Sequence, residues 1–231
     1  MLMEVTLVGS TQPRIIGIDN LEDFIAYCAK VSNPQLQDDF TNSKKLLLYL
    51  MKHKHWSPFE MASVTLEIET TRDIGRQILR HRSFSFQEFS QRYKEVDAID
   101  HPYVTRDARY QDTKNRQDSI ELDRESHHDH DLNKSWHMKQ TQLLHETKLA
   151  YKWALENGIA KEVARVILPE GNTVSRLYMQ GSVRSWIHYI ELRSGNGTQK
   201  EHMLVAQECA RAIAPIFPLI SDFIAENKEA R

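Results

Sequence analysis

The segment spanning residues 80–92, RHRSFSFQEFSQR, constrains this chain more than any other part of its sequence. Arginine, histidine and serine side chains crowd into it, and arginine supplies planar, bidentate donors for phosphate or carboxylate groups. Glu88 is the odd member, because a carboxylate repels phosphate and instead suits the donor groups of a base or a sugar. Phe84, Phe86 and Phe89 are interleaved with the polar residues, so the segment is predicted to be half buried. It predicts a site for a polyanion; the alternative is a solvated, charge-rich surface stretch.

A basic stripe leads into this segment from the preceding helix, which is predicted at 71–80. Arg72, Arg76 and Arg80 recur every four residues along it, with Gln77 beside them. This spacing places the side chains on one helix face. Taken alone, such a stripe is more often a solvated face, but its junction with the arginine-rich segment favours a ligand-binding wall.

Hydrophobic periodicity divides the rest of the chain into strands and helices. The predicted strands are 4–9 and 14–18, joined as a hairpin, and 64–69, with one wet face. Six helices are predicted. The first follows an N-cap at Asn20, and the second begins at 43. The third begins at about 143 and ends at Gly158, the fourth begins at 160 and ends before Pro169, the fifth begins at 173, and the last begins at a capping box over 198–201. The sequence shows no internal repeat and no Gly/Ser-rich linker, so one domain is expected over 1–231.

A polar excursion at about 97–140 interrupts this pattern. Its length and composition predict a mobile surface segment. His127, His128 and His130 lie in it, but their spacing fits no strong zinc pattern, so no metal site is predicted.

Charge and cysteine usage exclude several classes of protein. The net charge is −2, and no RNA-binding motif is recognisable, so neither a nucleic-acid surface nor an RNA-binding module is expected. No apolar stretch is long enough to span a membrane, and the N-terminus shows no signal peptide. Cys28 and Cys209 cannot form a disulfide scaffold, which favours a cytoplasmic protein.

The order of residues in the arginine-rich segment resembles the signature of the flavin-dependent thymidylate synthases. Arg80-His81-Arg82 is followed after seven residues by Ser90, with Glu88 and Arg92 in place. Gln87 is a departure, because the family often has Asn there. Further matches are 29–32, 55–60, 164–165, 168–169, 175–176, 190–193 and 197–202.

This resemblance implies a fold and an activity. The implied fold is α+β, a mainly antiparallel sheet flanked by helices. The implied reaction is reductive methylation of dUMP to dTMP, with methylenetetrahydrofolate as the carbon donor and FAD, reduced by NADPH, as the hydride source. Members of the family are homotetramers whose sites draw on several subunits, so the site residues need not meet within one chain.

The resemblance also assigns roles to individual residues. Those implied to contact FAD are His55, Ser57, Arg80, His81, Arg82, Ser83, Glu88, Glu191, Arg193 and Gly197. Those implied to hold dUMP are Gln77, Arg80, Glu88, Ser90, Arg92 and Arg176. The expected catalytic residues are Ser90, as a positioning group, Arg176 and His202. Glu191 stands where several members have Asn.

One departure bears on activity. The last helix of the family usually carries an Arg two positions after its Glu, near the uracil ring, whereas Glu201 is followed here by His202 and Met203. Methionine cannot stabilise a developing anion. A non-catalytic relative that binds FAD and nucleotide therefore remains the main alternative. A cysteine-nucleophile thymidylate synthase is the other, and it is disfavoured because neither Cys28 nor Cys209 has an adjacent cation in sequence.

Overall fold

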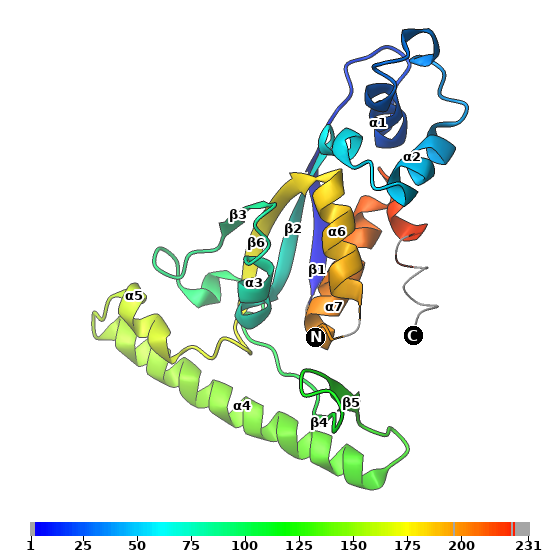
Figure 1. Ribbon diagram of the computed structural model, residues 1–231. Coiled ribbons are helices and arrows are strands. Elements are labelled where there is room, and N and C mark those ends of the chain that lie inside the picture. Colours follow the sequence, from blue (N-terminus) through cyan, green and yellow to red (C-terminus); the bar gives the residue numbers. More distant parts are fainter. Residues whose placement is uncertain (1–2, 196, 223, 225–231) are drawn as a thin grey trace.

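A four-stranded antiparallel sheet forms the centre of the molecule (Figure 1). The computed structural model describes residues 3–195, 197–222 and 224. The strand order is β1-β2-β6-β3, and the strands are β1 (Glu4–Ser10), β2 (Ser63–Thr71), β6 (Val174–Ser182) and β3 (Ser85–Glu88). The α+β class expected from the sequence is confirmed.

One face of the sheet is apolar and lies in the core. In the central pair, Leu66 lies opposite Met179 and Ile68 opposite Leu177, and all four side chains are fully buried. Because successive side chains of a strand point to opposite faces, Glu67 and Arg176 lie on the other, polar face. The predicted strand at 64–69 is confirmed, and its wet face is this polar one.

Two helices cover the apolar face. They are α6 (Val183–Ser194) and α7 (Lys200–Ile213), which pack side by side in Figure 1. Trp186 of α6 is fully buried, and its Nε1 donates a hydrogen bond to the carbonyl oxygen of Val64 at 3.0 Å. This bond satisfies the polar atom of a large core side chain. The short helix α3 (Arg72–Ile78) follows β2 directly and packs on the same face.

Two N-terminal helices, α1 (Leu21–Ala29) and α2 (Ser43–Lys52), lie at one end of the sheet (Figure 1). Both predicted helices are confirmed. The predicted N-cap is also confirmed, since the Asn20 side chain accepts a hydrogen bond from the Asp23 N–H at 2.8 Å. Cys28 on α1 is only half buried, whereas Cys209, which lies further along the chain, is fully buried.

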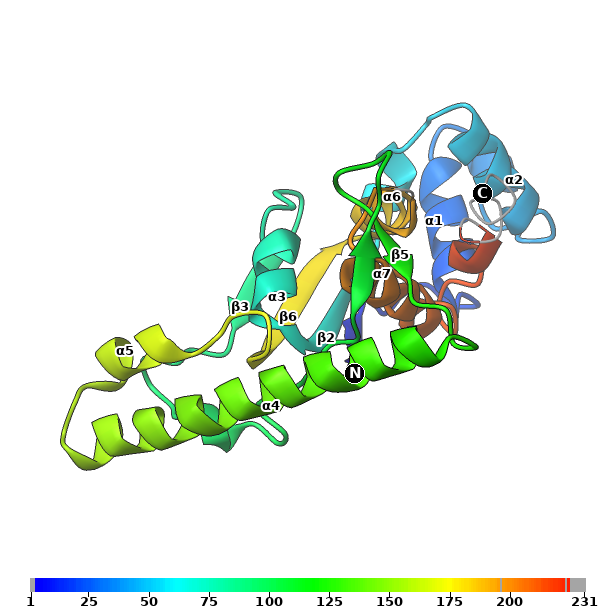
Figure 2. The same ribbon diagram turned by 90° about the horizontal axis from the view of Figure 1, so that it is seen from below.

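The polar excursion contains regular structure. After η3 (Val96–Ala98) come a hairpin of β4 (Arg109–Gln111) and β5 (Ser119–Glu121) and a 30-residue helix, α4 (His127–Glu156). In Figure 2, α4 runs past the end of the sheet, with α5 (Lys161–Ala164) and η4 (Arg165–Ile167) near its C-terminal end. The predicted start of this helix near 143 is wrong, because Ser126 caps it at its true start. No cluster of metal-ligating side chains is found among the described residues.

A second, small core joins α4 to the preceding and following segments. It comprises Val96, Tyr151, Ala154, Ala164 and Leu168. Leu143 and Ala150 of the same helix are exposed.

Two predicted elements are wrong in type. Residues 14–18 form a turn, because β1 pairs with β2, far along the chain, and not with a neighbouring strand. The helix predicted at 173–192 is β6 followed by α6. The change of structure comes at Ser182, whose side chain caps α6 by accepting a hydrogen bond from the Ser185 N–H.

The final helix is confirmed, but its predicted capping box is wrong. The N-cap position is Gln199 and not Thr198, and Gln199 makes no side-chain capping bond. Glu201, the expected capping acid, instead binds Arg109. No described helix has the length and apolar character needed to cross a membrane.

Candidate active site

The arginine-rich segment occupies the connection from α3 through β3. Arg80, Arg82 and Ser83 are exposed in the loop before β3. The guanidinium groups of Arg80 and Arg82 have no hydrogen bond or ion pair within residues 3–195 and 197–222. Two free guanidinium groups at one loop fit a pyrophosphate or another polyanion.

His81 is a half-buried residue of this loop and pairs with Arg193 of α6. Arg193 Nε donates a hydrogen bond to His81 Nε2 at 2.9 Å, so Nε2 must be unprotonated. The imidazole also meets the Tyr189 ring edge-on at 4.9 Å between centroids. Burial lowers the pKa of His81 to about 4, and the positive charge of Arg193 adds to this effect. The structure thus joins two residues that were predicted to contact FAD and keeps His81 neutral at pH 7.

His202 is fully buried between Gln77 and Tyr189. Its Nδ1 lies 3.1 Å from Gln77 Oε1 and its Nε2 lies 3.1 Å from the Tyr189 hydroxyl. Burial lowers the pKa of His202 to about 3, with smaller contributions from Arg193 and His81. The predicted catalytic His202 therefore lies out of solvent as a neutral group, in a place suited to holding Gln77.

The same hydrogen-bonded chain continues from Gln77 to the β4–β5 hairpin. Gln77 Nε2 donates to Gln199 Oε1 at 2.8 Å, and Gln199 Nε2 donates to Glu201 Oε2 at 2.9 Å. Arg109 of β4 closes the chain with two bonds to the Glu201 carboxylate, of 2.7 and 3.0 Å. Arg109 is not among the site residues predicted from the sequence. No local pattern could show that it meets Glu201.

Glu88 lies on the apolar side of the sheet, near α3. Its Oε1 accepts a hydrogen bond from Ser175 Oγ at 3.1 Å. Arg72 and Arg76 each approach the Glu88 carboxylate at 3.6 Å. Two arginines of the predicted basic stripe therefore face Glu88 of the arginine-rich segment. Arg72 is buried, whereas a residue of a solvated helix face would be exposed.

Ser90 and Arg92 lie just beyond β3. The Ser90 Oγ accepts a hydrogen bond from the Arg92 N–H at 3.4 Å, and Arg92 Nε donates to Glu162 at 3.2 Å. No histidine hydrogen-bonds to Ser90 within the described ranges, as a nucleophilic serine would require.

Arg176 is separated from this group. It lies on strand β6, not on a helix, and it pairs there with Glu69. Glu88 is in register with Leu177, so its side chain and that of Arg176 leave opposite faces of the sheet. One chain therefore does not bring the predicted dUMP residues together.

The remaining predicted FAD residues lie in two other places. His55 and Ser57 are exposed next to η2 (Ser57–Glu60). Glu191 helps to line a cavity of about 710 Å³ that also contains Trp56 and His188. No hydrogen bond or ion pair joins any of these residues to Arg80 or Arg82 in the part of the chain that the structure describes.

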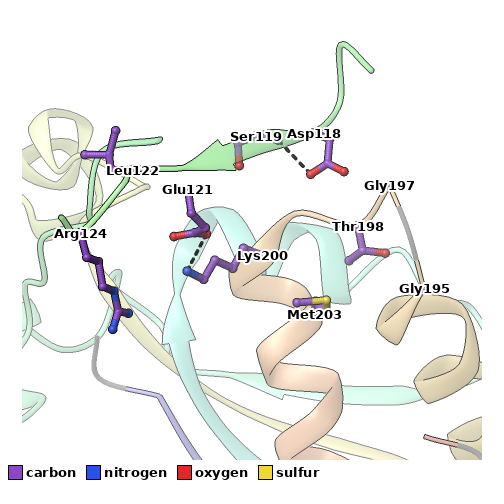
Figure 3. Close-up of a pocket in the computed structure, with 10 residues that line it drawn as sticks. All are labelled: Asp118, Ser119, Glu121, Leu122, Arg124, Gly195, Gly197, Thr198, Lys200 and Met203. Carbon is purple, nitrogen blue, oxygen red and sulfur yellow. Dashed lines mark hydrogen bonds and ion pairs between the residues drawn. The ribbon is translucent and has the colours of Figure 1, made fainter. Parts of the chain in front are cut away.

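Gly197 and Met203 share a pocket of about 380 Å³ between the β4–β5 hairpin and the start of α7. Figure 3 shows Glu121 of the hairpin reaching Lys200 of the helix, and these two groups form an ion pair of 2.7 Å. Met203 lies on the helix wall of this pocket (Figure 3). Gly197 has a φ of +81°, a left-handed conformation that favours glycine.

Comparison with known proteins decides the family. Residues 14–219 match the family model described as thymidylate synthase complementing protein. A protein of Paramecium bursaria Chlorella virus 1, named "Probable flavin-dependent thymidylate synthase", is 46% identical; the match covers 95% of this chain and 97% of that protein. The chain belongs to the flavin-dependent thymidylate synthase family.

Other relatives in this family agree. The flavin-dependent thymidylate synthase of Synechocystis sp. is 45% identical over 95% of this chain and 98% of its own. The solved structure of a UMP/dUMP methylase, PolB from Streptomyces cacaoi, superposes with a TM-score of 0.77 at 28% identity. It covers 97% of this chain and 95% of its own. Family membership confirms the resemblance carried by residues 80–92, the fold, the assignment as an enzyme and the flavin cofactor.

Proposed function

We propose that this protein converts dUMP to dTMP by reductive methylation at C5 of the uracil ring. Methylenetetrahydrofolate supplies the carbon in this proposal, and NADPH reduces the flavin. The observation that carries the proposal is a loop in which the exposed Arg80 and Arg82 flank the neutral His81, which pairs with Arg193. PolB, whose fold matches, is described in complex with 5-Br dUMP, which supports a uracil nucleotide as substrate.

The residues present fit FAD. Arg80 and Arg82 offer hydrogen-bond donors to the phosphates of FAD. The neutral imidazole of His81 and the guanidinium of Arg193 offer FAD an uncharged ring beside a positive charge. Ser83, Gly197, Glu191, His55 and Ser57 complete the proposed set. When bound, FAD would supply the hydride, and the protein groups would orient and polarise the cofactor and the substrate.

The proposed dUMP site uses Gln77, Glu88, Ser90 and Arg92, together with Arg80. The carboxylate of Glu88 can accept from the donors of a base or a sugar, and the Ser90 hydroxyl positions the nucleotide without acting as a nucleophile. His202 acts through Gln77, which it holds by the 3.1 Å contact.

Arg176 completes this site from a second copy of the chain. It lies on the face of the sheet opposite Glu88, and so cannot join Glu88 within one chain. Helix α4 also carries exposed apolar side chains that suit an interface, including Trp136, Met138 and Trp153. These features support a homotetramer with shared sites. Cys28 and Cys209 are not joined to each other, and so small a number of cysteines fits a cytoplasmic location.

The test measures product with purified protein, FAD, NADPH, methylenetetrahydrofolate and dUMP carrying tritium at C5. We expect tritium release and dTMP formation that depend on FAD. Absence of both, with FAD and dUMP shown to be bound, would leave the non-catalytic binding protein as the better reading.

The structure weighs against a cysteine nucleophile. Burial raises the pKa of the Cys28 thiol, and it raises that of Cys209, on a fully buried side chain, further still. A nucleophilic cysteine needs the opposite shift.

Replacing Met203 by Arg should raise kcat/KM for dUMP by about tenfold or more, because a fixed donor near a developing anion is typically worth a few kcal/mol. The 380 Å³ pocket beside Met203 leaves room for the longer side chain. The kinetics should be compared with Met203→Leu, which adds no charge and should match the parent. A folded, flavin-loaded Arg variant that is no faster would show that another group already serves the ring.

A further inference from the structure

The polar face of the sheet carries a cluster of charged side chains around Arg176. Arg176 of β6 lies directly opposite Glu69 of β2, and the next pair on this face joins Tyr178 to Glu67. Side chains that lie directly opposite each other on one face of an antiparallel pair are close enough to interact. The proposed FAD and dUMP sites include none of Glu67, Glu69 and Tyr178.

Glu69 holds one edge of the Arg176 guanidinium. Arg176 Nε donates a hydrogen bond to Glu69 Oε1 at 2.6 Å, and Arg176 Nη2 pairs with the same oxygen. Charge-assisted hydrogen bonds of this kind are roughly twice as strong as neutral ones, and a planar guanidinium gives them a defined geometry. Glu69 therefore fixes the orientation of the guanidinium relative to the strand.

The other edge of the guanidinium stays available for a ligand. An arginine side chain carries more N–H donors than one carboxylate oxygen can accept. Arg176 Nη1 makes no hydrogen bond within residues 3–195 and 197–222, and the Arg176 side chain is 44% exposed. The free edge, formed by Nη1 and the second hydrogen of Nη2, fits the acceptor oxygens of a nucleotide.

Burial and distance distinguish Glu69 from Glu67. Glu69 is only 8% exposed, so its carboxylate has little freedom to move away from Arg176. Glu67 Oε1 lies 3.9 Å from Arg176 Nε, which is beyond hydrogen-bond range. Glu67 instead serves Tyr178, whose pKa is raised by a hydrogen bond to Glu67. Glu69 alone of the two acids holds Arg176 by a hydrogen bond.

The two acids also set the direction of a purely electrostatic effect. Glu67 and Glu69 place two negative charges beside the single positive charge of Arg176. On charge alone, removal of either carboxylate would strengthen the binding of an anionic nucleotide. If Glu69 instead orients Arg176, its removal weakens binding. The direction of the change therefore separates the two effects.

We propose that Glu69 is a positioning residue, which holds Arg176 so that the free edge of its guanidinium meets the nucleotide bound by a second copy of the chain. The inference rests on the proposed function, in which Arg176 completes the dUMP site of that copy. A side chain that is fixed before binding loses less conformational entropy when the ligand arrives, and this strengthens binding. Glu69 itself touches neither dUMP nor FAD.

The test measures the affinity of the FAD-loaded protein for dUMP by calorimetry. Glu69→Ala removes the acceptor, whereas Glu69→Gln removes the charge but keeps an acceptor oxygen. Glu69→Asp keeps the charge but draws the carboxylate back by one methylene, so it tests the same contact if Glu69→Ala does not fold. Glu67→Ala is the matched control, because it removes a charge from the same face of the same strand and leaves the 2.6 Å bond intact.

We expect Glu69→Ala and Glu69→Asp each to weaken dUMP binding by about tenfold, the effect of losing a charge-assisted hydrogen bond. Glu69→Gln should recover most of this loss, and Glu67→Ala should bind dUMP as tightly as the parent or more tightly. FAD content should match the parent in all four variants.

A double-mutant cycle decides whether Glu69 acts through Arg176. In the Arg176→Ala background, Glu69→Ala should cause no further loss of dUMP affinity. The inference would be overturned by unchanged or tighter dUMP binding in folded Glu69→Ala or Glu69→Asp, or by an equal loss in the Arg176→Ala background. Failure of the proposed function is a separate result, namely Glu69-dependent dUMP binding without dTMP formation.

Discussion

Replacing Glu201 by Gln is expected to lower the free energy of unfolding by about 3–5 kcal/mol, the usual cost of removing one partner of a buried ion pair. Glu201 is 3% exposed, and Arg109 holds it with two hydrogen bonds. The substitution leaves the Arg109 guanidinium without its counter-charge. Denaturant unfolding measures the effect. Glu208→Gln, at a more exposed pair on the same helix, should change stability by less than about 1 kcal/mol.

The same ion pair gives a pH dependence. Burial alone would raise the pKa of Glu201, but hydrogen bonds from Arg109 and Gln199 outweigh it and lower the pKa to about 2, from an ordinary 4.5. A depressed pKa stabilises the folded state fully above the unfolded value, and the contribution disappears as the pH falls from about 4.5 to about 2. The Glu201→Gln variant should lack this part of the acid transition. An identical acid profile would mean that Arg109 and Glu201 do not pair in solution.

Replacing Gly181 by Ala should lower stability by about 1–3 kcal/mol, a typical cost of overpacking a core. A Cβ at this position would lie 2.5 Å from Phe84 Cδ1 and 2.6 Å from Phe84 Cε1. The Phe84 ring is itself packed against Trp186, with 4.9 Å between centroids. The ring must therefore move, and it carries the flanking Ser83 with it, so FAD affinity should fall as well.

A second substitution separates this steric effect from other causes. Phe84→Leu in the Gly181→Ala background removes the clashing ring atoms and should recover part of the lost stability, measured by thermal unfolding. Gly9→Ala is the matched control on β1, because its nearest neighbour would lie at an ordinary 3.7 Å. Equal destabilisation by the two alanines would point to strand propensity and not to Phe84.

Local periodicity predicted the elements whose cause is local. The α1 helix and its Asn20 cap, α2 and the alternating strand β2 all depend on residues within one element. The helix predicted from residue 173 is wrong over strand β6, where Leu177 and Met179 alternate with polar neighbours in a period-2 pattern. No Pro separates β6 from α6. The boundary between them is marked only by Ser182, which caps α6. The pairing of β1 with β2 depends on contacts remote in sequence, so no local signal could show it.

The candidate site divides in the same way. The resemblance assigns both His81 and Arg193 to the FAD site, and a hydrogen bond joins the two side chains. The roles of the individual site residues stay predictions. Sequence could not reveal that His202 is buried, that Gln91 has an unused donor, or that Arg109 reaches Glu201, because each depends on packing between distant segments.

The placement of Glu88 and Arg176 on opposite faces of one sheet has a genetic consequence. On the proposed shared site, each chain lends Glu88 to one site and Arg176 to another. A chain with Glu88→Ala still carries an intact Arg176, and a chain with Arg176→Ala still carries an intact Glu88. Two alleles that are each inactive alone should then complement one another when co-expressed. In a mixed assembly, some sites receive an intact Arg176 from one chain and an intact Glu88 from the other. Alleles that alter residues on the same face, such as Glu88 and Ser175, should not.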